Sequence, residues 1–130
     1  MEIISVLVAA AASWVFGAIW YMLLAEPWVE ASGVKTNDEG KPANQSIIPF
    51  ILSAIAMILV AGMMRHVFAM ADITGTVKAI LAGLGIGAFF ITPWILINNA
   101  YAGRSYLLTA IDGGYAILGC GIIGAVLTLL

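Results

Sequence analysis

Four long stretches almost free of charged residues decide the class of protein to which this chain belongs. Three of them cover residues 3–25, 42–64 and 79–103, and the fourth covers 105–130 with one charged residue, Asp112. A helix needs about 20 apolar residues to cross the ~30 Å hydrocarbon core of a bilayer, and each stretch reaches that length. Because 63% of the 130 residues are hydrophobic and only 9% are charged, a small water-soluble domain could not bury this much apolar surface.

These stretches predict an all-α integral membrane protein, a four-helix bundle with up-down-up-down topology. The whole chain, 1–130, is expected to form one domain, because four spans leave no room for a soluble domain. The only sizeable loop is expected over residues 26–46, with a turn at Asp38-Glu39-Gly40 and with Asn44 or Ser46 capping the second span. The expected spans are about 3–24, 47–67, 77–99 and 105–128.

Charge says more about partners than about orientation. The net charge of −2 gives no basic surface for nucleic acid, so the expected partner is the lipid bilayer. An even number of spans places both termini on one side of the membrane. The positive charges near the span ends are almost balanced between the two sides, and we expect cytoplasmic termini. Those on the terminal side are Arg65 and Lys78, and those on the other side are Lys35, Lys41 and Arg104.

Small residues recur at the spacing that lets membrane helices approach closely. Helix association in lipid depends on close packing rather than on the hydrophobic effect, and small residues at i, i+4 spacing permit it. The chain has 14 glycines, about one and a half times the average usage. We expect helix packing at Gly17 in the first span, Gly83 and Gly87 in the third, and Gly124 in the fourth. A glycine-lined solute pathway is the alternative.

Asp112 is the one carboxylate inside a span. An aspartate in the middle of a membrane helix costs about 2.5–3.5 kcal/mol, less when it is off-centre and faces protein. We therefore expect its side chain to face the bundle and to have a hydrogen-bond partner. Both a structural clamp and a functional site remain open. The partners considered are Arg104, Asn98, Asn99, Tyr101, Tyr106 and Tyr115.

Several polar and aromatic residues fall at a similar depth on the Asp112 side. Counting 1.5 Å per residue from the span centres places Trp20 and Trp94 near this level, with Asn98 and Asn99 about one turn further out and Arg104 at the mouth of the fourth span. An aromatic belt and a helix cap are the structural alternatives for these residues. The candidate site is Asp112, Asn98, Asn99, Arg104, Trp20, Tyr21, Trp94 and Tyr115.

Motifs of enzymatic or metal chemistry are absent from the sequence. It contains no phosphate loop, nucleophile elbow, paired histidines or CxxC motif. The single histidine, His66, and the single cysteine, Cys120, do not form a metal-binding pattern. We therefore expect no catalytic residues, no metal, no cofactor and no enzymatic activity.

Two segments resemble a known family. The opening Gly17-Ala18-Ile19-Trp20-Tyr21, followed by Trp28, is similar to a G-x-x-W-Y…W pattern. The later stretch runs from Asn98-Asn99 through Arg104 to Asp112-Gly113-Gly114-Tyr115 and then Gly124. Both resemble patterns of the bacterial membrane family called domain of unknown function 1761. Members often have Ser-Pro after the Trp-Tyr pair and a basic residue before the next Trp, where this chain has Met22-Leu23 and Glu26-Pro27.

The resemblance implies a four-helix integral membrane protein of the bacterial inner membrane without an assigned activity. It also singles out Trp20, Tyr21, Asn98, Arg104 and Asp112 as members of one site. Three hypotheses about function follow. The leading one is a non-enzymatic membrane protein that packs as a homo-oligomer or with a larger membrane protein. The alternatives are a small transporter or proton-coupled carrier that uses Asp112, and a binder of lipid or another hydrophobic ligand.

Overall fold

The structure is a computed structural model that describes residues 2–43 and 46–130. Over these residues it is all-helical, without strands apart from one isolated β-bridge between Thr36 and Pro42. The elements are α1 (Glu2–Leu23), α2 (Ala25–Ser32), α3 (Ile48–Met70), α4 (Thr76–Ile86), the π-helical turn η1 (Gly87–Ile91), α5 (Thr92–Tyr101) and α6 (Tyr106–Leu129).

Four helices are long and apolar enough to cross a membrane. They are α1, α3, the continuous unit of α4, η1 and α5 over Thr76–Tyr101, and α6. Their limits differ from the predicted spans by at most three residues. The prediction of an all-α protein with four membrane-spanning helices is therefore confirmed.

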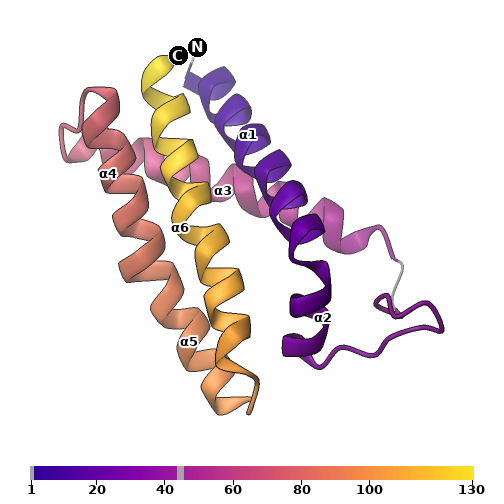
Figure 1. Cartoon of the computed structure of the whole chain (residues 1–130). Helices are drawn as coiled ribbons and strands as arrows, with labels where there is room; N and C mark the ends of the chain where they lie inside the picture. The colour runs from indigo at the N-terminus through magenta and orange to yellow at the C-terminus, as the bar shows by residue number, and fades with distance from the viewer. Residues whose placement is uncertain (1, 44–45) are drawn as a thin grey trace.

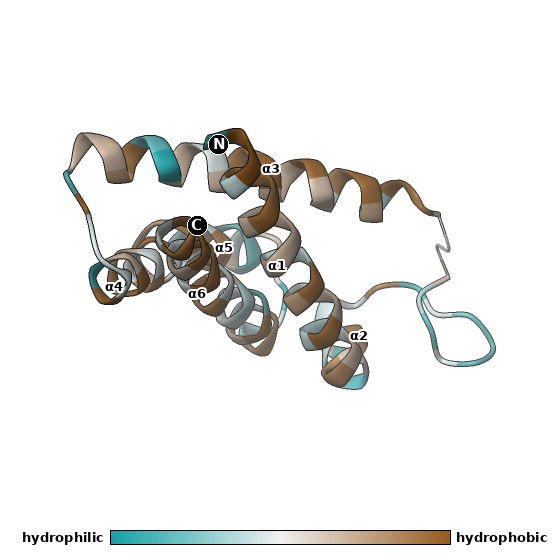
Figure 2. Ribbon diagram, turned by 90° about the horizontal axis from the view of Figure 1, so that it is seen from above, coloured by the Kyte–Doolittle hydropathy of each residue, from teal (hydrophilic) through white to brown (hydrophobic). Residues whose placement is uncertain are grey.

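The four long helices do not lie side by side in a regular bundle. Helix α6 is central, packed between α1 on one side and α4, η1 and α5 on the other (Figure 1). Helix α3 packs mainly on α1 and crosses obliquely behind the others. Viewed from above, α3 lies across the picture while α1, α4 and α6 are seen closer to end-on (Figure 2). The ends of α1 and α6 that carry the chain termini lie close together (Figure 1).

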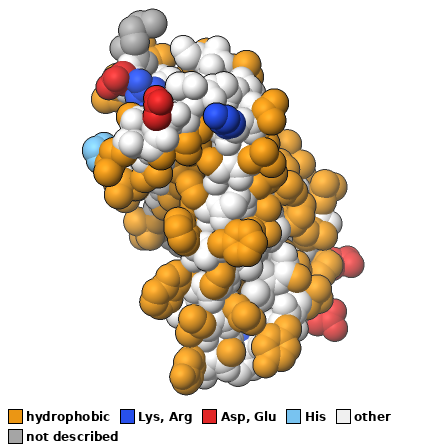
Figure 3. All heavy atoms as spheres, turned by 90° about the vertical axis from the view of Figure 1, so that its left-hand side faces the viewer, with side chains coloured by type: hydrophobic (Ala, Val, Ile, Leu, Met, Phe, Trp, Pro, Cys, Tyr) orange, Lys and Arg blue, Asp and Glu red, His pale blue; other side chains and the backbone are white. Residues whose placement is uncertain are grey.

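The outer surface is what a lipid environment requires. Large hydrophobic side chains cover the face seen in Figure 3, and charged side chains gather at its upper end and along one edge. Helix α3 is one example, because Phe50 and Met63 are each more than 60% exposed and Leu59 is 69% exposed. Apolar side chains that would be unfavourable in water are favourable against lipid chains.

Glycines bring the helix backbones together around α6. A Cβ atom built on Gly83 would overlap the backbone of Cys120, and one on Gly124 would overlap the backbone of Ala79. A Cβ atom on Gly87 would likewise overlap the backbone of Ala116. The contact between α4 and α6 therefore depends on the absence of side chains at these positions.

Pro93 interrupts the third span in the way its chemistry requires. Proline has no N–H and cannot complete the regular helical hydrogen-bond pattern. Just before it, the backbone widens into the π-turn η1. The carbonyl oxygen of Gly87 accepts hydrogen bonds from both the backbone N–H and the hydroxyl of Thr92, the latter at 2.7 Å.

The connection after α1 is more structured than predicted. Its first part, expected to be loop, forms the short helix α2, which ends at Gly33 with a φ of 69°. The turn over 37–41 follows the Asp38-Glu39-Gly40 signal, with Gly40 at a φ of 78°. The N-cap position of α3 is Ile47 rather than the predicted Ser46, although the hydroxyl of Ser46 accepts a hydrogen bond from the backbone N–H of Ile48. Asn44 lies outside the described residues.

Candidate functional site

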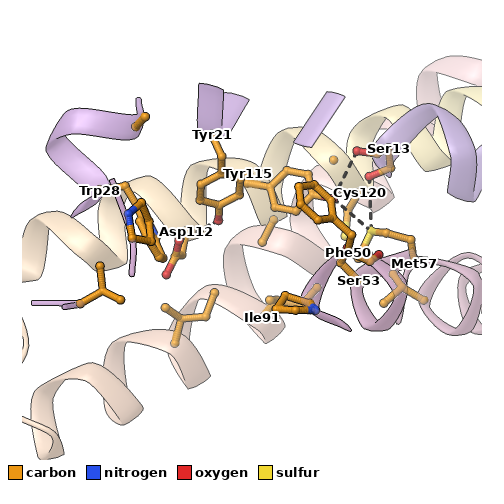
Figure 4. Close-up of a pocket in the computed structure, with 18 of the residues that line it drawn as sticks. Ser13, Tyr21, Trp28, Phe50, Ser53, Met57, Ile91, Asp112, Tyr115 and Cys120 are labelled. Atoms are coloured by element: carbon orange, nitrogen blue, oxygen red, sulfur yellow. Dashed lines mark hydrogen bonds between the residues drawn. The ribbon is translucent and has the colours of Figure 1, made fainter. Parts of the chain in front are cut away.

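A cavity of about 900 Å³ lies between α1, α2, α3 and the helices η1, α5 and α6 (Figure 4). It exists because α3 packs on α1 and meets α6 over a shorter stretch, which leaves a space next to η1 and α5. Small residues of α6, such as Ala116 and Gly119, widen this space. The residues that line the cavity include Ser13 and Tyr21 from α1, Trp28 from α2, Phe50, Ser53 and Met57 from α3, Ile91 and Ile95 from η1 and α5, and Asp112, Tyr115, Ala116, Gly119, Cys120 and Ile123 from α6.

Asp112 is the only charged residue among the described residues that line the cavity. Its Oδ1 atom accepts a hydrogen bond of 2.7 Å from the hydroxyl of Tyr21. The two ion pairs found in the described residues, Glu39–Lys41 and Glu2–Arg65, do not include Asp112. The carboxylate therefore has a neutral hydrogen-bond donor and no cationic partner in the described part of the chain.

A continuous group of aromatic rings surrounds this carboxylate. Tyr21 makes edge-to-face contacts with Trp28, at a centroid distance of 6.3 Å, and with Tyr115, at 5.5 Å. Phe16 continues the group, at 6.1 Å from Tyr115 and 5.8 Å from Trp20. Rings at these distances attract one another, so they fix the side of the cavity that contains Asp112.

Two glycines place the largest of these side chains. The ring of Tyr115 lies over Gly17, and the indole of Trp20 lies over Gly114, each within 2.7 Å of the position that a Cβ atom would occupy. The Trp20 Nε1–H also donates a hydrogen bond of 2.9 Å to the carbonyl oxygen of Ile111. Each helix therefore has a notch for an aromatic side chain of the other, directly beside Asp112.

The deeper part of the cavity has a second, weakly polar group. The Tyr115 hydroxyl lies 3.2 Å from the backbone oxygen of Ser13 and 3.3 Å from the sulfur of Met57. The Ser13 hydroxyl lies 3.6 Å from the same sulfur. These contacts join α1, α3 and α6, so the polar atoms here hold the helices together.

The chain as a whole matches one protein family. The match is to the family described as "Protein of unknown function (DUF1761)" and covers residues 4–128. The chain belongs to this family. No curated protein and no solved structure matched it. Membership in DUF1761 supplies no activity, so the geometry of the cavity is the main guide to function.

The structure brings together half of the site residues predicted for this DUF1761 member. Tyr21, Asp112 and Tyr115 line the cavity, and Trp20 packs beside them, over Gly114 and with its Nε1–H bonded to the carbonyl oxygen of Ile111. The partner of Asp112 is Tyr21, which was not among the partners considered from the sequence. Because 91 residues separate Tyr21 from Asp112, only the packing of α1 on α6 reveals the pair.

The other predicted site residues lie elsewhere. Asn99 is buried and donates a hydrogen bond of 3.0 Å to the hydroxyl of Thr109, which joins α5 to α6. Asn98 and Arg104 are exposed, and Trp94 is 68% exposed on the outer surface. These positions fit the belt and connection roles considered as alternatives, away from the cavity.

Several residues that form the cavity were not proposed from the sequence. Trp28 had a signal, because it belongs to the G-x-x-W-Y…W pattern of the family. Phe50, Ser53 and Met57 had none, because every face of α3 is apolar and its tilt cannot be read from spacing. Within the described residues, no group of three or more His, Cys, Asp or Glu side chains could hold a metal ion.

Proposed function

We propose that the protein is a non-enzymatic membrane protein whose cavity binds a hydrophobic ligand, such as a lipid or another amphiphile, within the bilayer. The observation that carries the proposal is the cavity itself. Its volume of about 900 Å³ falls in the range of small-molecule sites, roughly 300–1,000 Å³, and most of its lining residues are apolar. Apolar walls with a few polar groups at one end are the usual design of such sites.

The depth of the cavity fits an alkyl chain that enters from one leaflet. The lining residues extend from Trp28 in α2 past Tyr21 to Ser13, which lies about halfway along α1. The distance along α1 from Tyr21 to Ser13 is ~12 Å at 1.5 Å per residue. This is close to the ~15 Å thickness of one hydrocarbon leaflet, so a chain could lie in the cavity with its polar head near Trp28.

The contacts of the polar groups favour binding over catalysis. The hydroxyls of Tyr21, Tyr115 and Ser13 all make contacts that join different helices. A hydroxyl used in this way fixes the shape of the cavity. These contacts support the assignment of a binding role rather than an enzymatic one.

A cavity-filling pair of variants tests this proposal. Ala116→Phe places a ring on the α6 wall of the cavity, whereas Ala110→Phe places the same ring on an exposed position of α6 outside the cavity. The probe is a long-chain alcohol with a photoreactive diazirine at its end, applied to protein in nanodiscs of zwitterionic lipid. Mass spectrometry should locate labelled residues in the cavity of the native protein and of Ala110→Phe, and Ala116→Phe should lose most of this labelling. Equal labelling of the two variants, or labelling spread evenly over the lipid-facing surface, would refute the proposal.

A second candidate function is assembly with another copy of the chain or with a larger membrane protein. The oblique course of α3 supports it, because α3 packs mainly on α1 and leaves many large apolar side chains exposed in the monomer. A neighbouring subunit could cover the outer face of α3 in place of lipid. Cross-linking in native membranes should trap a defined assembly, and monomers in several mild detergents would contradict this candidate.

The location proposed for the protein is the bacterial inner membrane, with both termini in the cytoplasm. The four apolar helices support a multi-pass arrangement. The two termini lie at one end of the structure, which supports a common side for both (Figure 1). Reporter fusions at each terminus should give cytoplasmic signals, and a reporter inserted after Gly40 should report the opposite side.

A further inference from the structure

We infer that the ligand of the cavity is a cationic amphiphile, an alkyl chain with an ammonium head group that pairs with Asp112. This inference rests on the proposed binding function and names the chemical class of the ligand. The juxtaposition of Asp112 with Tyr21, Trp28 and Tyr115 at one end of an apolar cavity carries it.

Charge is the first step. Asp112 is the only charged residue among the described residues that line the cavity, and no lysine, arginine or histidine of residues 2–43 and 46–130 forms an ion pair with it. Charges removed from water are normally paired, since an unpaired one is costly in an apolar medium. A cation in the cavity would supply the missing partner, and an anion would be repelled.

The free oxygen of the carboxylate is the second step. Tyr21 donates its hydroxyl to Oδ1, and no hydrogen bond to Oδ2 occurs within the described part of the chain. Asp112 is only partly buried and lines the cavity, so Oδ2 is open to a ligand. The Tyr21 bond holds the carboxylate in place, which lowers the conformational cost of binding.

The aromatic rings are the third step. Trp28, Tyr21 and Tyr115 all line the cavity beside Asp112, as Figure 4 shows. The faces of aromatic rings attract cations, with tryptophan the strongest, and such rings commonly surround quaternary ammonium groups. Tyr21 meets Trp28 and Tyr115 edge to face, at interplanar angles of 85° and 77°. The planes of Trp28 and Tyr115 are therefore both steeply inclined to that of Tyr21, the residue bonded to Asp112.

The apolar part of the cavity indicates the chemistry of the rest of the ligand. Beyond Tyr115 the cavity continues along Ala116, Gly119 and Ile123 of α6 and along Met57 and Val60 of α3. None of these side chains is charged, so this part suits an alkyl chain and excludes a second charged group. The ligand is therefore singly charged at one end and apolar along its length.

The test compares three probes that share one alkyl chain and differ in the head group: a trimethylammonium, an alcohol and a sulfonate. Each competes with the diazirine alcohol for labelling of the cavity in zwitterionic nanodiscs, and empty nanodiscs correct for partitioning into lipid. We expect the ammonium probe to bind roughly tenfold or more tightly than the alcohol, and the sulfonate to bind least. Asp112→Asn should remove the preference for the cation over the alcohol.

Asp72→Asn is the matched control, because it makes the same change at an exposed position outside the cavity and should keep the preference. Trp28→Leu, which keeps the carboxylate, should reduce the preference and provides a second variant if Asp112→Asn does not fold. Equal binding of the three probes to the native protein, or a cation preference that survives Asp112→Asn, would overturn the inference and leave the proposed function intact. Failure of all three probes to compete would overturn both.

Discussion

At the scale of single residues, Asp112 shows how a membrane helix accommodates a carboxylate. The hydroxyl of Tyr21 satisfies one oxygen, and the rings of Trp28 and Tyr115 enclose the pair. A charge inside a membrane helix is costly, and this cost predicts that Asp112 has a hydrogen-bond partner. The sequence does not identify Tyr21 as this partner, because hydrophobic spacing does not show how α1 is rotated relative to α6.

Removal of the Tyr21 hydroxyl should measure the contribution of this bond. Tyr21→Phe keeps the ring contacts and loses the hydrogen bond to Asp112, so we expect the free energy of unfolding to fall by about 1 kcal/mol. Tyr101→Phe is the control, since Tyr101 is 91% exposed and its hydroxyl makes no contact with the cavity. Reversible unfolding in mixed micelles measures both, and equal stability of the two variants would show that the bond contributes nothing.

At the scale of helices, α6 depends on small residues more than any other element. Glycines of α4 and α6 allow the two backbones to touch at Gly83 and Gly124. The spacing of small residues in the sequence predicts close packing at these positions. The notches at Gly17 and Gly114 were harder to foresee, because each receives an aromatic ring from a helix distant in sequence.

Two glycines of α4 provide a direct test of this packing. A Cβ atom at Gly83 would overlap the Cys120 backbone, so Gly83→Ala should push α4 away from α6 and destabilise the protein by about 1–3 kcal/mol. Gly85→Ala meets nothing within 4 Å and should be neutral, or stabilising by up to about 1 kcal/mol through helix propensity. Thermal unfolding in detergent distinguishes the two, and a tolerated Gly83→Ala would show that the helices do not touch as described.

At the scale of the whole molecule, the tilt of α3 was the feature that the sequence did not predict. The length of the uncharged apolar stretches predicts four spans, and the limits of the four long helices lie within three residues of them. The expected four-helix bundle did not specify the angles between the helices, and α3 crosses behind α6 (Figures 1 and 2). An apolar helix with no polar face has no sequence signal for its direction, and the cavity beside it follows from that direction.

The loose attachment of α3 should be visible in its dynamics. It packs mainly on α1, and 11% of its apolar window is buried, the same share as in Thr76–Tyr101, compared with 33% for α1 and 44% for α6. Segments with few buried contacts open at lower free energy. In detergent, the backbone amides of α3 should therefore exchange with deuterium before those of α1 and α6. Equal protection of α3 and α6 in monomeric protein would contradict the described packing.

The widened turn at Gly87–Ile91 has a consequence for how the chain can vary. Each residue of an α-helix turns the chain by about 100° about the helix axis. A π-turn accommodates one additional residue without changing the orientation of the residues that follow it. Loss of one residue before Asn99 would rotate its side chain by over a quarter of a circle away from Thr109. Insertions and deletions in this span are therefore compatible with the fold only where a compensating change restores the rotation of the helix, so that Asn99 again faces Thr109.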